Sequence, residues 1–129
     1  SHNTVIGHSF GAFVAGAADN PKIGGGLNAD AMVLVGGPGA STDNITDLSM
    51  VPENIHIVLG EDDWINDARR WGLDEHFSVP LQDDEFFENP DDPGEELGNR
   101  LDPTEETGHS EYFEDEQTLD YLGDLMPGK

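Results

Sequence analysis

Residues 4–11 read Thr-Val-Ile-Gly-His-Ser-Phe-Gly, and the character of the chain changes at Ser9. A short apolar run rich in β-branched residues stands before the serine, which is typical of a buried strand. Residues 10–19 are mostly small, and they suit a helix that packs closely on its neighbours. The stretch therefore predicts a strand over residues 4–8 that turns sharply at Ser9 into a helix.

Two more apolar runs continue this pattern. Residues 31–35 read Ala-Met-Val-Leu-Val and residues 55–59 read Ile-His-Ile-Val-Leu, and a glycine follows each. Near-continuous apolar runs of this length are typical of strands buried on both faces of a parallel sheet. Connections long enough for helices separate them, so the sequence predicts an α/β fold with a parallel sheet. At 129 residues, one domain is expected.

The second half of the chain has a different composition. Asp, Glu and four prolines dominate residues 73–107, which predicts an irregular acidic excursion, either a lid or a mobile loop. Helical spacing returns in Leu119, Leu122 and Leu125. A terminal helix over residues 115–125 is therefore expected to pack on the sheet.

The charge is strongly negative. The chain has 28 Asp and Glu against five Lys and Arg, a formal net charge of −23. Such a field repels nucleic acid and anionic membranes, so neither is expected as a partner. The acidic composition resembles that of protein surfaces in salt-accumulating organisms. The alternative interpretation is that the acidic residues belong to a disordered segment. No apolar run approaches the roughly 20 residues of a membrane-spanning helix. With no cysteine, any chemistry depends on Ser, His and carboxylates.

The segment from Gly7 to Gly11 matches G-x-S-x-G, the motif in which a sharp turn between a strand and a helix presents a serine as a nucleophile. We expect glycines on both sides because the turn leaves no room for side chains there. An apolar strand before the motif and a small-residue helix after it are the context that the motif requires. The alternative is a glycine-rich turn that holds an incidental serine.

A carboxylate and a histidine follow in the order that a catalytic triad needs. Asp62 and Asp63 come directly after the third strand, at the sheet edge where α/β folds build their sites. His109 comes later, before the terminal helix, whereas the other four histidines lie at the terminus, in the motif, in a strand and in the acidic segment. A triad acid orients the histidine, which takes the proton of the serine. The plainer interpretations are a helix cap or acidic surface for Asp62 and Asp63, and a polar loop residue for His109.

Four blocks of the sequence are distinctive when taken together: residues 4–11, Val33 to Gly39, Asp62 to Ile65 and Gly108 to Phe113. They resemble the C-terminal half of an α/β-hydrolase, in particular an uncharacterised group known chiefly from actinobacteria. The departures from that group are Phe10, Gly37 and Trp64 in place of the usual Tyr, Ser and Pro, and a lengthened acidic stretch around residues 83–107.

The resemblance implies an incomplete parallel-sheet fold, in which residues 1–129 form the C-terminal part of one α/β-hydrolase domain. Hydrolases commonly place the acid three residues after a glycine such as Gly60, which favours Asp63 over Asp62. The amide of Phe10 is the oxyanion donor that this chain can supply. A second donor belongs to a loop that precedes the motif, so residues 1–129 alone are expected to be nearly inactive. Association is expected through the incomplete sheet edge or with a missing N-terminal half.

The predicted function is a serine hydrolase that acts on an ester or amide of a small molecule through Ser9, Asp63 and His109, without cofactor or metal. The acidic blocks at residues 83–85 and 91–92 lack the ligand spacing of a calcium loop. A non-catalytic acidic binding module and an acyltransferase are the alternatives. The sequence does not identify the substrate. The composition favours the cytoplasm of a salt-accumulating organism, with secretion as the alternative.

Overall fold

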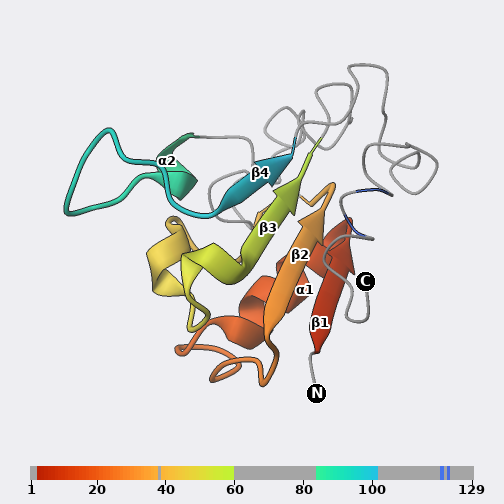
Figure 1. The fold of residues 1–129 in the computed structure, drawn as a ribbon. Coiled ribbons are helices and arrows are strands. Elements are labelled where there is room, and N and C mark those ends of the chain that lie inside the picture. The colour runs from red at the N-terminus through yellow and green to blue at the C-terminus, as the bar shows by residue number, and fades with distance from the viewer. Residues whose placement is uncertain (1–2, 38, 60–83, 102–119, 121, 123–129) are drawn as a thin grey trace, which may run out of the picture.

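Four parallel strands lie side by side in the order in which the chain forms them (Figure 1). The computed structural model describes residues 3–37, 39–59, 84–101, 120 and 122. Every neighbouring pair of strands is parallel, which confirms the α/β sheet expected from the sequence. The strands are β1 (Thr4–His8), β2 (Ala31–Val35), β3 (Ile55–Val58) and β4 (Asn99–Leu101).

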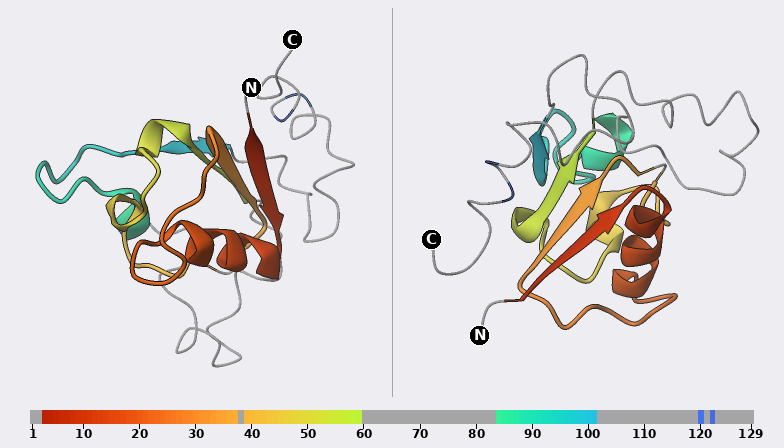
Figure 2. Two further views of the ribbon diagram at one scale, coloured as in Figure 1. Left: turned by 90° about the horizontal axis from the view of Figure 1, so that it is seen from below. Right: turned by 90° about the vertical axis from the view of Figure 1, so that its right-hand side faces the viewer.

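Helix α1 (Phe10–Asp19) follows β1 and packs against β1 and β2. Its small residues allow this close approach: Ala12 is fully buried, and a Cβ added at Gly16 would collide with the backbone of Ala40. Figure 2 shows α1 and α2 on the same side of the sheet. Further helical segments include η1 (Ile45–Asp47), η2 (Pro52–Asn54) and the one-turn helix α2 (Asp84–Phe87).

The sheet buries apolar side chains on both faces because alternate residues of each strand point to opposite sides. On the α1 side, the core contains Met32 and Leu34 of β2 together with the fully buried rings of Phe86 and Phe87. On the other side, a smaller cluster contains Leu122, whose backbone is helical, in line with the expected terminal helix. Its other buried members are Val33, Val35 and Val58.

A buried carboxylate ties the connections between the strands to the end of α1. Asp19 is fully buried, and its two carboxylate oxygens accept the backbone N–H groups of Leu27 (3.0 Å) and Met50 (2.9 Å). Its backbone carbonyl also accepts the N–H of Ser49 at 3.0 Å. The two bonds to the carboxylate oxygens satisfy a group that would otherwise be costly to bury. The α1–β2 and β2–β3 connections are thereby fixed to one helix end.

The described part of the acidic segment contains regular structure where the sequence pattern predicts irregular surface. Residues 84–101 contain α2, β4 and the buried pair Phe86 and Phe87, so they extend the sheet and its core. Residues 73–83 and 102–107 lie outside the described residues, as does most of the expected terminal helix. The limits of the domain therefore stay a prediction. In the described part of the chain, no helix has the length and apolar character to cross a membrane.

Candidate active site

Ser9 adopts a backbone conformation that residues other than glycine rarely take. It joins the end of β1 to the start of α1 with φ 60° and ψ −126°. Conformations of this kind cost about 1–3 kcal/mol and persist where the surrounding structure enforces them. Here the N–H of Ser9 donates to the carbonyl of Val35 in β2 at 2.9 Å, and its carbonyl accepts the N–H of Ala12 at 3.0 Å. The sheet and the helix thus hold the turn from both sides.

The serine does not act as an ordinary helix cap. A serine directly before a helix usually accepts a hydrogen bond from an amide of the first turn through its hydroxyl. Ser9 occupies this position before α1, yet its side chain makes no capping hydrogen bond. Ser9 therefore does not cap α1, and a strained strand-to-helix turn at the serine is typical of the G-x-S-x-G motif.

The two glycines of the motif have different roles, which corrects the expectation that both are required by crowding. A Cβ at Gly7 would lie 2.5 Å from the carbonyl oxygen of Gly11 and 2.9 Å from the Cα of Ala12. A Cβ at Gly11 would meet nothing within 4 Å. Gly7 is therefore needed for the close approach of α1 to β1. The backbone of Gly11 lies against Gly7, but the position of its own Cβ is open, so crowding does not require a glycine there.

Phe10 is the first residue of α1, so its N–H stands at the positive end of the helix dipole. No acidic residue lies in the first turn to offset that charge, although the chain is strongly acidic elsewhere. The ring of Phe10 is 57% exposed and stacks on Phe13, with 5.7 Å between the centroids. The N-terminal end of α1 is thus both electropositive and apolar.

The parallel topology brings several chain segments to the same edge as Ser9. Because all four strands are parallel, their carboxyl ends lie together at one edge of the sheet. Asp63 follows the buried Leu59 by four residues, and His109 follows Leu101 of β4 by eight. The side chains of Asp62, Asp63 and His109 lie outside the described residues, so the triad stays a prediction.

Comparison with known protein families agrees with the strand–turn–helix around Ser9 and with the parallel sheet. A family model described as alpha/beta hydrolase matches residues 1–72, more than half of the chain. The chain belongs to the α/β-hydrolase superfamily. The matched part of this hydrolase-family chain includes Ser9, Phe10 and Asp63, whereas His109 lies beyond it. A search of the curated proteins and a search of the solved structures each returned no match.

One contact of the α/β-hydrolase turn was not expected from the sequence. The carbonyl of Val35 anchors the amide of Ser9, and it does so from β2, the strand next to the motif. A backbone carbonyl exists at every residue, so no side chain marks this position in the sequence. Only the pairing of His8 with Val35 in the register of β1 and β2 places it there.

Two of the described strands carry a histidine, His8 in β1 and His56 in β3. In the sheet register, His8 pairs with Val35, and His56 pairs with Val33 and Asn99. Burial lowers the pKa of His56 from 6.5 because the sheet disfavours the charged imidazolium. His56 is therefore mainly neutral at pH 7. Its position inside β3 separates it from the strand ends where the candidate active site lies.

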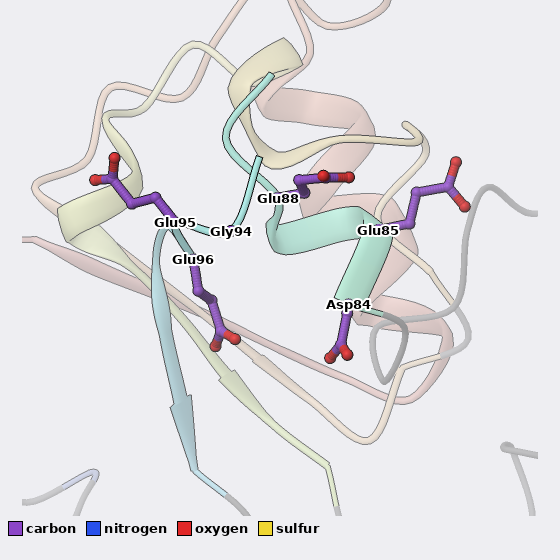
Figure 3. A pocket seen from close by; sticks show the side chains of 6 residues that line it. All are labelled: Asp84, Glu85, Glu88, Gly94, Glu95 and Glu96. Atoms are coloured by element: carbon purple, nitrogen blue, oxygen red, sulfur yellow. The ribbon is translucent and has the colours of Figure 1, made fainter. Parts of the chain in front are cut away.

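A hollow lies between α2 and the segment that leads into β4. Figure 3 shows carboxylates of α2 and of the α2–β4 connection around it. Arg100 balances two of them, with ion pairs to Asp84 (2.9 Å) and Glu96 (3.0 Å). Among the described residues, no group of three or more side chains is arranged to hold a metal ion. The lining residues are Asp84, Glu85, Glu88, Gly94, Glu95 and Glu96.

Proposed function

We propose that this chain contains the catalytic serine of a hydrolase that cleaves an ester or amide bond. Ser9 is the nucleophile, His109 the general base, Asp63 the acid that orients His109, and the amide of Phe10 an oxyanion donor. The observation that supports this most is the strained backbone of Ser9 between β1 and α1, held without a helix-capping bond. Membership in the α/β-hydrolase superfamily supports the same assignment.

The reaction proceeds in two balanced steps. The Ser9 hydroxyl oxygen bonds to the substrate carbonyl carbon while His109 takes the hydroxyl proton. The bond to the alcohol or amine then breaks, and His109 returns the proton to that leaving group. Water repeats the sequence on the acyl-serine, which releases the acid and restores the Ser9 hydroxyl. Asp63 stabilises the imidazolium that forms in each step.

The helix end supplies the charge stabilisation. The carbonyl oxygen becomes negative when the serine attacks, and an N–H at the start of α1 can donate to it. The N–H of Phe10 belongs to the residue that directly follows Ser9, and the dipole of the ten-residue helix adds to it. Because the first turn has no carboxylate, the developing negative charge meets no repulsion from α1 itself.

We further propose that the protein is folded and active at high ionic strength. A net charge of −23 on 129 residues destabilises a compact chain through self-repulsion unless counterions screen it. Screening over distances of a few ångströms needs about 1 M salt, at which the Debye length is ~3 Å. We therefore expect activity in concentrated salt, and molar KCl is the medium in which it is tested.

A fluorophosphonate probe tests the serine. The protein expressed from its complete reading frame should become covalently labelled in 2 M KCl, and Ser9→Ala should abolish labelling. Ser41→Ala is the matched control, since Ser41 also has a positive φ of 61° but follows β2 rather than standing before a helix. It should be labelled as the wild type is. His109→Ala should slow labelling by about 100-fold or more, as expected when a general base is lost.

Two results would contradict the proposal. Labelling that persists in Ser9→Ala would place the nucleophile elsewhere. A folded protein that takes up no probe in molar salt would indicate an acidic binding module that has kept the fold without the reaction. Circular dichroism of each variant provides the check on folding.

A further inference from the structure

We propose that Asn20, at the C-terminal end of α1, is a positioning residue for Ser9. It acts through the connection that leaves β2 directly after Val35, the residue whose carbonyl holds the Ser9 amide. The proposal rests on the assignment of Ser9 as the nucleophile. It adds a residue at the opposite end of α1 from the reacting hydroxyl, outside the G-x-S-x-G motif.

The connection after β2 is fixed where it begins. Val35 is the last residue of β2, and its carbonyl accepts the N–H of Ser9 at 2.9 Å. Gly36 then turns the chain with a φ of 58°, and its N–H donates to the carbonyl of Val58 in β3 at 2.8 Å. The turn at Ser9 and the start of this connection therefore share one anchor, the end of β2.

Farther along, the same connection is fixed to α1 by two contacts. Ala40 is fully buried, and a Cβ added at Gly16 would lie 2.2 Å from its carbonyl oxygen, so only a glycine allows this close approach. At the next residue, the carbonyl of Ser41 accepts a hydrogen bond from the side-chain Nδ2 of Asn20 at 3.3 Å. The Oδ1 of the buried Asn20 accepts the N–H of Lys22 at 2.9 Å, which fixes the direction of the amide.

The connection has little slack between its two fixed ends. Helix α1 has ten residues and is about 15 Å long. The connection passes from the level of Ser9 to the level of Asn20 within residues 36–41, and six residues span at most about 20 Å. It therefore links both ends of α1 to β2.

Loss of the Asn20 amide would release one of these ends. Strain such as that of the Ser9 backbone persists only where the surrounding structure enforces it. Once the link to the Ser41 carbonyl is lost, α1 can shift relative to β2, and the turn at Ser9 can relax. The hydroxyl of Ser9 and the amide of Phe10 then move away from the positions that the reaction needs.

Labelling kinetics separate positioning from stability. Asn20→Asp keeps the acceptor for the Lys22 N–H and removes the donor to Ser41. The protein expressed from its complete reading frame is titrated with a fluorophosphonate in 2 M KCl, which gives the limiting rate constant of labelling, kinact, and the half-saturating probe concentration, KI. In Asn20→Asp, kinact should fall about tenfold while KI stays unchanged, because misplaced groups slow bond formation without weakening probe binding. Asn20→Ser, uncharged and too short to reach Ser41, should give the same result.

Asn44→Asp is the matched control, because it makes the same chemical change in the same kind of contact. The Oδ1 of Asn44 accepts the N–H of Thr46 at 3.0 Å, and its Nδ2 donates to backbone carbonyls of Glu85 and Glu88. It stands before η1 and is bonded to the α2 region rather than to α1. This variant should lose stability and keep the wild-type kinact.

Two results would overturn the role of Asn20. Either the folded Asn20→Asp and Asn20→Ser variants keep the wild-type kinact, or Asn44→Asp lowers kinact as much as they do. Circular dichroism in 2 M KCl checks that each variant is folded. If the wild type itself takes up no fluorophosphonate, the proposed function fails, which is a different result.

Discussion

At Ser9, backbone hydrogen bonds hold the strained turn. The amide is bound by the carbonyl of Val35, and the helix that begins at Phe10 uses the Ser9 carbonyl. The hydroxyl is thereby left without a role in capping α1. Backbone strain at this position supports the proposed role of Ser9 as the nucleophile.

The glycines of the motif provide a prediction at the scale of single residues. Gly7→Ala should destabilise the protein by about 1–3 kcal/mol, since its Cβ would overlap the backbone of the first turn of α1. Gly11→Ala should be neutral or stabilise by up to about 1 kcal/mol, because its Cβ meets nothing and alanine favours a helix. Urea denaturation in 2 M KCl measures both. Equal destabilisation by the two substitutions would contradict this assignment.

Among the elements, one arginine links α2 to β4. The guanidinium of Arg100 in β4 lies 3.7 Å from the ring centroid of Phe87 and forms ion pairs with Asp84 and Glu96. Asn44 holds the other side of α2, because its side-chain amide donates to the carbonyls of Glu85 (3.2 Å) and Glu88 (2.8 Å). A one-turn helix cannot be stable alone, so these contacts determine its position.

Removal of the arginine should loosen α2 from the sheet. Arg100→Gln should cost about 1–2 kcal/mol and speed hydrogen exchange of the α2 and β4 amides, since the cation–π contact and both ion pairs are lost. Lys22→Gln is the matched control, because it removes one positive charge from an exposed residue outside this contact. Its exchange pattern should stay that of the wild type. Equal acceleration of amide exchange in both variants would show that the loss of a positive charge, and not the loss of the Arg100 contacts, causes the effect.

The elements differ in how well the sequence predicts them. The first three strands and α1 are predicted almost residue for residue, because apolar runs and small residues identify them. β4 has only three residues, Asn-Arg-Leu, all half-buried, so no apolar run marks it. The four residues of α2 are too few for helical periodicity. In the site, the motif identifies Ser9, but the open space at Gly11 and the Val35 contact depend on where α1 and β2 pack.

Over the whole molecule, charge is expected to control stability. The melting temperature should rise as KCl increases from 0.1 to 2 M, since the Debye length falls from ~10 Å to below ~3 Å. A gain of about 2 kcal/mol corresponds to a rise of roughly 5–10 °C for a domain of this size. Neutralising three exposed acids in Glu53→Gln, Asp91→Asn and Asp92→Asn should reduce that salt dependence. A melting temperature independent of salt would contradict this role of charge.

The strand order has a consequence for how the protein forms during translation. Since every strand pairs with the strand that precedes it in the chain, each newly synthesised segment meets its partner already present. Pairing strands that are neighbours along the chain costs less loop-closure entropy than pairing strands further apart in the sequence would. The turn at Ser9 can therefore form once β2 leaves the ribosome, because its anchor at Val35 is the last residue of that strand.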